Sequence, residues 1–281
     1  MARFHIMHCM PDSQQHGLRG YQEVIDTLSW GLQQLGHEVS HAVNGSVRGA
    51  TNIIFGAHMI TVEGLAKLPD NSIAYSLEQA RNLDPRQAPP TVQFFAKRFQ
   101  VWDYSLANMG FWKGLGTPRV KLVPIGYAPV LSRIPGDVPQ DIDVLIYGMS
   151  APNRLLAFNQ LSYAGLTVLF VSGLYGKPRD ELIARSKLVL NVNMYDAAQI
   201  FEVVRVSYLL ANRKAVIATR HPETFVEDDI AAAVRFTTMD RLVDDCRALI
   251  ANTPARAALE ARGFETMARR DIRAVLAAAL G

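Results

Sequence analysis

A glutamate and an arginine lie three residues apart in an otherwise apolar segment of this 281-residue chain. The segment is QIFEVVRVSYLLANRKAVIAT, residues 199–219, and its charged pair is Glu202 and Arg205. Residues three apart share one side of a helix, and a helix that is apolar nearly all round belongs in a protein core. Because an unpaired buried charge is costly, the two side chains either form an ion pair with each other or face a polar ligand.

Two other short stretches carry residue types that suit a phosphate or a nucleoside. In DVLIYGMSAPNR, an apolar segment typical of a strand is followed by Gly148, Ser150 and Arg154. In KLVLNVNMYD, Asn191 and Asn193 close a similar segment. Glycine lets a phosphate approach the backbone, an arginine can hold it through two parallel hydrogen bonds, and an asparagine can pair with a base or a sugar. An ordinary tight turn or a turn cap would use the same residues, so both interpretations stay open at this point.

The stretch FVSGLYGKPRDELI has the composition of a basic, flexible loop. Gly173 and Gly176 lie between an apolar segment and a helical one, with Lys177 and Arg179 beside them. Such a loop could bind an anion, although a solvated surface turn is the simpler interpretation. None of these stretches matches GxGxxG, so a dinucleotide site of the NAD type is not predicted.

Ionisable side chains also follow the apolar segments of the first half. His58 follows NIIFG, Glu78 follows SIAYS and Asp103 ends FQVWD, while Asp12 lies in the loop PDSQQHGLRG. Any of them could act as a general base for a substrate hydroxyl within hydrogen-bond reach, and we rank them in the order Glu78, Asp103, His58 and Asp12. The alternative for each is a helix cap, a common role for carboxylates at such a position.

The composition is that of a globular protein, with 49% hydrophobic and 20% charged residues. The net charge of +3 is too small and dispersed to predict a nucleic-acid surface, whereas association of a basic helix with a membrane surface stays open. No DxD motif and no cluster with metal-ligand spacing predicts a metal, and Cys9 and Cys246 are expected to be reduced thiols. Because no apolar run approaches the ~20 residues that span a bilayer and no signal peptide is recognisable, we expect a cytoplasmic protein.

Apolar and amphipathic segments alternate along the chain, which predicts parallel α/β sheets. Strands are expected near residues 3–9, 39–43, 52–57, 72–77, 99–102, 120–123, 143–147, 166–171, 187–192 and 215–218, and the clearest helices near 21–35, 153–164, 179–185 and after 199. The stretch 124–140, rich in Pro and Gly, is typical of a linker. We therefore expect two Rossmann-like domains, residues 1–133 and 134–281, and the last helix could pack back on the first domain.

Three stretches of the second half resemble the nucleotide-sugar-binding half of GT-B glycosyltransferases. They are LIYGMSAPNR, LIARSKLVLNVNMY and IFEVVRVSYLLANRKAVIA. The likeness extends to VWDYSLANMGFW and VPIGY, so that it covers about residues 75–220. Over the first 70 residues or so, only the architecture matches.

The resemblance implies two Rossmann-like domains with a cleft between them, the second holding a nucleoside-diphosphate-sugar donor and the first an acceptor. It implies that Glu202 binds the ribose hydroxyls and that Arg205 faces the diphosphate, while the other strand-end residues of this half line the donor site. Many GT-B enzymes have two glutamates eight positions apart, whereas Met194 and Leu210 stand at those positions here. The donor is a substrate, and no separate cofactor is expected.

The implied activity is transfer of the sugar to an unidentified acceptor, whether glycan, lipid, protein or small molecule. A general base is needed only if transfer inverts the anomeric centre, which the sequence leaves open. Two alternatives remain on the same fold. One is an epimerase of nucleotide sugars, and the other is a non-catalytic protein that binds a sugar nucleotide or a partner enzyme.

Overall fold

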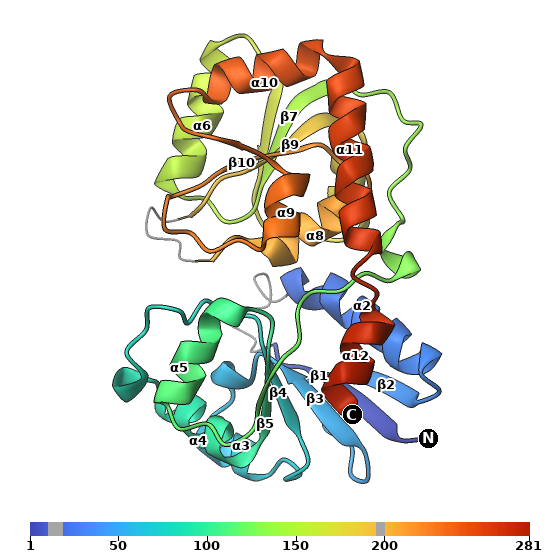
Figure 1. Cartoon of the computed structure of the whole chain (residues 1–281), viewed down its shortest axis with the longest axis vertical. Coiled ribbons are helices and arrows are strands. Elements are labelled where there is room, and N and C mark those ends of the chain that lie inside the picture. Colours follow the sequence, from blue (N-terminus) through green and yellow to red (C-terminus); the bar gives the residue numbers. More distant parts are fainter. Residues whose placement is uncertain (11–18, 195–199) are drawn as a thin grey trace. The chain divides into compact units, whose positions relative to one another are not determined.

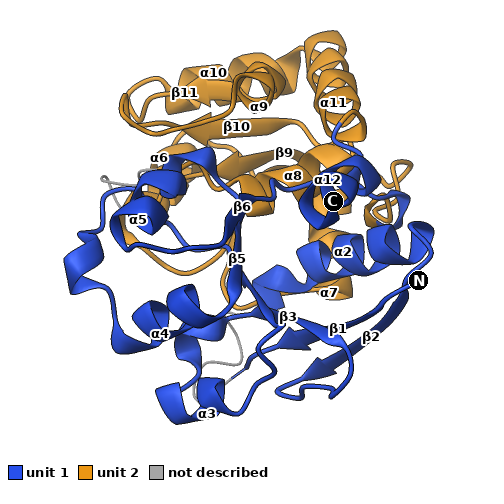
Figure 2. Ribbon diagram, turned by 60° about the horizontal axis from the view of Figure 1, so that its bottom comes forward, with its two compact units in different colours: residues 1–130, 270–281 blue, residues 131–269 orange. Residues whose placement is uncertain are grey.

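The computed structural model describes residues 1–10, 19–194 and 200–281, so the candidate base Asp12 lies outside the described residues. The chain divides into two compact units (Figure 2). Unit 1 comprises residues 1–130 and 270–281, and unit 2 comprises residues 131–269. Each unit is built around its own β-sheet.

Unit 1 contains a six-stranded sheet in the order β2-β1-β3-β4-β5-β6, and every neighbouring pair is parallel. A parallel sheet is buried on both faces, which explains why central strands are runs of apolar residues such as Ile53, Ile54 and Phe55, each 0% exposed. The strands are β1 (Arg3–His8), β2 (Glu38–Val43), β3 (Thr51–Phe55), β4 (Ile73–Ser76), β5 (Gln100–Asp103) and β6 (Val120–Leu122).

The last helix of the chain belongs to unit 1. Gly31 permits this packing, because a Cβ at that position would lie 2.7 Å from Leu276 Cδ1 and 2.9 Å from Ile272 Cγ2. The backbone of Tyr127 also pairs with both Arg270 and Ile272, at 2.7 and 3.0 Å. The α-helices of unit 1 are α2 (Gln22–Gln34), α3 (Val62–Ala66), α4 (Pro90–Arg98), α5 (Met109–Gly114) and α12 (Ile272–Leu280).

Unit 2 contains a five-stranded sheet in the order β11-β10-β9-β7-β8, again parallel throughout. Its strands are β7 (Ile142–Tyr147), β8 (Val168–Val171), β9 (Ser186–Asn191), β10 (Val216–Thr219) and β11 (Arg235–Thr237). Its helices are α6 (Pro152–Tyr163), α7 (Lys177–Ala184), α8 (Val203–Ala211), α9 (Asp228–Ala233), α10 (Leu242–Ala251) and α11 (Thr253–Ala268), and Figure 1 labels all of them except α7. Among the helices of the described residues, none is long and apolar enough to cross a bilayer.

The expected fold class, with two parallel α/β sheets, is confirmed. Each strand expected from an apolar segment is present, with ends displaced by at most about two residues, the usual uncertainty of such boundaries. Strand β11 and the helices α3, α4 and α5 are not among the expected elements. β11, α3 and α5 span only three to six residues, which is too short to display a periodic pattern. Helix α4 has nine residues, which is less than three turns.

The helix expected to carry both Glu202 and Arg205 begins later than the sequence suggests. Glu202 precedes α8 with a non-helical backbone, φ −72° and ψ 55°. Just before it, the Phe201 N–H donates to the Phe225 carbonyl at 2.9 Å, and Ile200 forms an isolated bridge with the same residue. This pairing satisfies backbone groups that a longer helix would have used. Glu202 therefore lies at the N-terminal end of α8, and Arg205 lies in its first turn.

Candidate functional site

The charged pair of the apolar segment lies in unit 2, near the carboxyl ends of two sheet strands. β7 and β9 are paired in parallel, so their ends meet at one edge of the sheet. Gly148 follows β7, and Asn191 is the last residue of β9. In open parallel sheets this edge is where ligands bind.

Glu202 accepts hydrogen bonds from two arginines, Arg154 and Arg205. We call the three residues the arginine–glutamate cluster. Arg154 Nη2 donates to Glu202 Oε1 at 2.9 Å, and Arg205 Nη1 donates to Glu202 Oε2. The Arg154 side chain is 2% exposed, whereas Glu202 is 19% and Arg205 21% exposed. The ion pair considered from the sequence therefore exists, but within a larger cluster that reaches solvent.

The cluster carries an excess of positive charge, because two guanidinium groups and one carboxylate leave +1. Burial and the neighbouring charge of Arg205 lower the pKa of Arg154, and the carboxylate of Glu202 opposes this effect. The N-terminus of α8 adds a partial positive charge at the same place. Such an arrangement suits a small anion. For the described residues, no group of three or more His, Cys, Asp and Glu side chains is placed to hold a metal ion.

The two arginines differ in how firmly they are held. Arg154 is fixed by the carbonyls of Val192 and Met149, to which its Nε and Nη1 donate at 2.9 and 2.8 Å. Arg205 Nη1 donates to Asn191 Oδ1 at 3.0 Å in addition to Glu202. Within the described parts of the chain, Nε and Nη2 of Arg205 have no hydrogen-bond acceptor, so this guanidinium retains donors for a ligand.

Gly148 makes room for both arginines. A Cβ at this position would lie 2.8 Å from Arg154 Nη1 and 2.8 Å from Arg205 Nη2. Its φ of +131° is also one that residues with a side chain rarely adopt. A glycine is therefore required here by the cluster itself.

Two asparagines bring further polar atoms to this edge. Asn191 is 0% exposed and Asn193 is 5% exposed. Asn191 Nδ2 and Asn193 Oδ1 are buried without a hydrogen-bond partner among the described residues. Because buried polar groups are normally paired, these atoms are candidates for contact with a ligand.

An alternating stack of aromatic rings and arginines supports Arg205, and sequence reasoning missed it. The guanidinium carbons of Arg205 and Arg179 lie 5.3 and 5.9 Å from the ring centre of Tyr147, and that of Arg179 lies 4.7 Å from the ring centre of Tyr208. Tyr208 in turn donates to Asp180 at 2.8 Å. A signal existed in the sequence, since Tyr147 and Tyr208 are tyrosines in segments that are mostly aliphatic.

The remaining donor-site candidates are not joined to the cluster in the part of the chain that the structure describes. Ser150 is exposed. Gly173 and Gly176 have positive φ values of 73° and 63°, and nothing lies within 4 Å of a Cβ built on either. They are turn glycines in open space, and their role in binding a donor stays a prediction.

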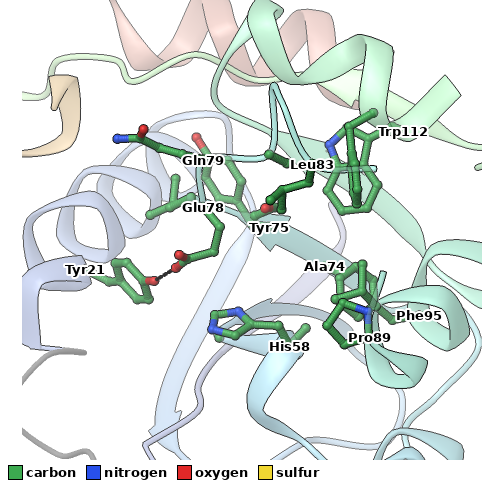
Figure 3. A pocket seen from close by; sticks show the side chains of 17 residues that line it. Tyr21, His58, Ala74, Tyr75, Glu78, Gln79, Leu83, Pro89, Phe95 and Trp112 are labelled. Carbon is green, nitrogen blue, oxygen red and sulfur yellow. Dashed lines mark hydrogen bonds between the residues drawn. The ribbon is translucent and has the colours of Figure 1, made fainter. Parts of the chain in front are cut away.

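Unit 1 contains a pocket of about 240 Å³, next to the carboxyl end of β4 and the 3-10 helix η3 (Ala57–Met59) (Figure 3). It brings together two of the candidate bases, since Glu78 and the half-buried His58 both line it. Tyr21, which precedes α2, also lines it. Sequence reasoning did not identify Tyr21.

The Tyr21 hydroxyl donates a hydrogen bond to Glu78 Oε1. Burial, reinforced by the charge of Glu78, raises the pKa of Tyr21, so the hydroxyl keeps its proton at neutral pH. Glu78 Oε2 has no donor among the described residues. The carboxylate is exposed and can therefore accept a proton or a hydrogen bond from a molecule in the pocket.

Asp103, the second-ranked candidate base, lies in a buried network of hydrogen bonds. Its side chain is 0% exposed and accepts hydrogen bonds from Trp112 Nε1 at 2.7 Å, Ser105 N at 2.8 Å and Asn108 Nδ2 at 3.0 Å. Burial raises its pKa to about 7, although these hydrogen bonds oppose the rise. Asp103 does not line the pocket, so a substrate bound there could not exchange a proton with it directly.

Comparison with known sequences gives only distant relatives. No family model matches the chain. It is 25% identical over 167 residues to the uncharacterized protein L140 of Acanthamoeba polyphaga mimivirus, a match that covers 57% of this chain and 54% of that protein. It is 24% identical over 160 residues to the uncharacterized protein R358 of the same virus, covering 56% and 55%. The chain thus spans about half the length of these two relatives.

Comparison with solved structures is more informative. AviGT4, described as a glycosyltransferase involved in avilamycin A biosynthesis, superposes with a TM-score of 0.65 at 17% identity, over 100% of this chain and 96% of AviGT4. HepE from Anabaena, in complex with UDP-glucose, gives a TM-score of 0.61 at 14% identity, over 100% of this chain and 99% of HepE. WaaG, a glycosyltransferase involved in lipopolysaccharide biosynthesis, gives a TM-score of 0.55 at 13% identity, over 99% of this chain and 98% of WaaG. The chain therefore has the GT-B fold.

Proposed function

We propose that this protein is a glycosyltransferase that moves a sugar from a nucleoside-diphosphate sugar to an acceptor hydroxyl. The observation that carries the proposal is the arginine–glutamate cluster, which places a net positive charge at the sheet edge of unit 2. The same fold binds UDP-glucose in HepE, which supports a donor of this class.

Each member of the cluster has a part in holding the donor. A carboxylate has about four lone-pair positions, so Glu202 can accept from the ribose hydroxyls while it remains paired with Arg154. Arg205 directs its unused donors to the diphosphate, for which a planar guanidinium is well suited. Asn191 Nδ2 supplies a further donor. Arg154, held by two carbonyls, keeps Glu202 in position.

Transfer forms one bond and breaks another at the anomeric carbon. The acceptor oxygen bonds to that carbon, and the bond from the carbon to the diphosphate oxygen breaks with its electron pair going to the diphosphate. Arg205 and the N-terminus of α8 stabilise the charge that develops there. Glu78 takes the proton of the acceptor hydroxyl, and Tyr21 holds its carboxylate in place. This assignment of Glu78 corresponds to inverting transfer, and His58 is the second candidate for the same proton.

The proposal is tested first by the binding of nucleoside diphosphates and their sugars. A ligand that binds the folded protein raises its melting temperature, so the unsubstituted chain should respond to at least one member of a panel. Glu202→Ala should lose this response relative to its own ligand-free melting temperature. Glu265→Ala, which removes an exposed glutamate of α11, should keep it. A full response from Glu202→Ala would contradict the assignment.

Product analysis then separates transfer from the alternatives. With a functional acceptor present, the donor should yield free nucleotide and a glycosylated product in equal amounts. An altered sugar released with no acceptor present would identify an epimerase. Nucleotide binding without turnover across a broad acceptor panel would favour a non-catalytic protein.

A further inference from the structure

The pocket of unit 1 is divided into a polar side and an apolar side. In Figure 3, Tyr21, Glu78 and His58 lie on one side, while Trp112 and Phe95 lie on the other. The other lining residues with apolar side chains are Ala57, Ala74, Leu77, Ala80, Leu83, Pro89, Val92 and Phe111. The chemistry that this pocket recognises must match that division.

Tyr75 and Trp112 line the pocket, and the polar atom of each ring is already hydrogen-bonded within the protein. The Tyr75 hydroxyl donates to the Val123 carbonyl at 2.7 Å, and Trp112 Nε1 donates to Asp103 Oδ2 at 2.7 Å. Tyr75 is 3% and Trp112 2% exposed. Both therefore offer a ligand their ring carbons and not a hydrogen-bond donor.

The apolar side favours an aromatic ring over a sugar in the pocket. A sugar ring can lay its C–H face on one aromatic side chain, but any hydroxyl that faced Phe95, Phe111 or Trp112 would be buried without a partner. Each such loss weakens binding by roughly tenfold. An aromatic ring meets the same surface with favourable edge-to-face contacts. The lining thus favours an occupant with one polar end and one aromatic end.

The size of the pocket limits the occupant further. Its volume of about 240 Å³ is below the roughly 300–1,000 Å³ typical of pockets for drug-sized ligands. One aromatic ring with a short substituent fits this space. A glycan or a folded peptide would have to leave most of its bulk outside.

We propose that the pocket takes a small hydroxyl compound with one aromatic ring, its ring against Trp112 and Phe95 and its hydroxyl towards Glu78. The inference rests on the proposed function in one respect only, namely that this compound is the sugar acceptor. Glu78 Oε2 accepts the hydrogen bond from the bound hydroxyl, and the Tyr21 hydroxyl stays on Oε1. His58 borders the same polar side.

Binding is measured without any donor, so that the pocket is tested separately from the transfer reaction. The probe is 4-ethylphenol, and myo-inositol is the polyol of comparable size. Titration calorimetry or saturation-transfer NMR should show that 4-ethylphenol binds at least tenfold more tightly than myo-inositol. Equal affinities, or tighter binding of the polyol, would overturn the proposal.

A pair of matched variants tests whether 4-ethylphenol binds in this pocket. Leu83 lines the pocket and is 57% exposed, while Leu106 is 58% exposed and does not line it. Because both leucines are exposed, an aspartate at either position should leave the fold intact. Leu83→Asp should weaken 4-ethylphenol binding at least tenfold, whereas Leu106→Asp should leave it unchanged. Equal effects of the two variants would show that the probe binds elsewhere, and the proposal would fail.

Two outcomes separate this inference from the proposed function. If the protein binds a nucleoside-diphosphate sugar and glycosylates a polyol but no aromatic hydroxyl compound, the acceptor class is wrong and the transferase stands. If 4-ethylphenol binds at Leu83 and no nucleoside-diphosphate sugar binds at all, the pocket assignment stands and the transferase fails.

Discussion

Gly148 lies directly against Arg205, so that a Cβ on the glycine would be 2.8 Å from Arg205 Nη2. The same Cβ would be 2.8 Å from Arg154 Nη1. The residue after β7 thus sets how close the two guanidinium groups can come to the strand ends. Gly148 therefore positions the two arginines that we propose to act in donor binding.

A methyl group at this position should disrupt the cluster. Gly148→Ala adds backbone strain of about 1–3 kcal/mol at a φ of +131°, and it also displaces both arginines. We expect at least a tenfold loss of affinity for the nucleotide that raises the melting temperature of the unsubstituted protein. Calorimetric titration of that nucleotide gives the measurement.

Gly165→Ala is the matched control for Gly148→Ala. Gly165 also has a positive φ, +82°, but nothing lies within 4 Å of a Cβ built there. This control should show backbone strain without the clash, so its nucleotide affinity should be unchanged. If both variants bind equally well, the position of the guanidinium groups does not matter to the ligand.

Glu78→Gln tests the general base. The substitution keeps the size of the side chain and a hydrogen bond from Tyr21, but it cannot accept the proton of an acceptor hydroxyl. We expect kcat to fall by roughly 10²–10⁴-fold, with donor affinity unchanged. Steady-state kinetics together with donor titration separate the two quantities.

Glu63→Gln provides the comparison for Glu78→Gln, because Glu63 is an exposed glutamate on α3 of the same unit. It should retain full turnover. Undiminished turnover in Glu78→Gln itself would transfer the role to His58, or would indicate a retaining reaction that needs no such base.

The sheets could be predicted from the sequence, whereas the contacts that assemble the site could not. Central parallel strands such as β3 and β9 contain the apolar runs IIF and LVL, and such runs are visible locally. The bond from Arg154 to Glu202 spans 48 residues and depends on β7 and β9 being neighbours, which no local pattern reports. Glu202 was recognised because a charge in an apolar segment is conspicuous. Arg154 was also a candidate, but its pairing with Glu202 became evident only in three dimensions.

Asp103 shows that two carboxylates which look alike in the sequence can have different surroundings in the fold. Its position at the end of β5 made it resemble Glu78 in the sequence, but the two side chains have different environments. The aromatic residues around Asp103 exclude water, and Trp112, Ser105 and Asn108 occupy its oxygens. Asn108 and Trp112 lie only five and nine residues further along the chain. Whether their side chains turn onto the carboxylate depends on how α5 packs, which residue type and spacing do not report.

The burial of Asp103 predicts a pH dependence of stability. Its pKa is raised from 3.8 to about 7 in the folded protein, so between these values the folded state binds the proton more tightly than the unfolded state. The contribution of this group is therefore fully present below about pH 4 and is lost as the pH rises through 7. We expect a difference of about 2–4 kcal/mol between the two limits.

The contribution of Asp103 is isolated by comparison with Asp103→Asn, which cannot titrate. Carboxylates with lowered pKa, such as Asp143 and Asp245, act in the opposite direction, so the total stability of one protein is not informative. The free energy of unfolding of the unsubstituted protein minus that of the variant, from urea titrations, should decrease from pH 4 to pH 8. A difference that stays constant over this range would show that Asp103 is charged throughout.

The packing of the last helix, α12, on α2 predicts that Gly31→Ala and Leu276→Ala have coupled effects on stability. Replacing a helical glycine by alanine normally stabilises a helix by about 0.5–1 kcal/mol, but at Gly31 the new methyl group would meet Leu276 Cδ1 at 2.7 Å. Because Leu276 is 0% exposed, we expect overpacking of about 1–3 kcal/mol to dominate, so that Gly31→Ala lowers the free energy of unfolding. Leu276→Ala removes the shorter of the two clashes, while Ile272 Cγ2 would still lie 2.9 Å from the new methyl group. In that background Gly31→Ala should therefore cost less than in the unsubstituted protein. Urea unfolding of the four proteins in this double-mutant cycle measures the coupling, and strictly additive effects would mean that the two helices do not pack as described.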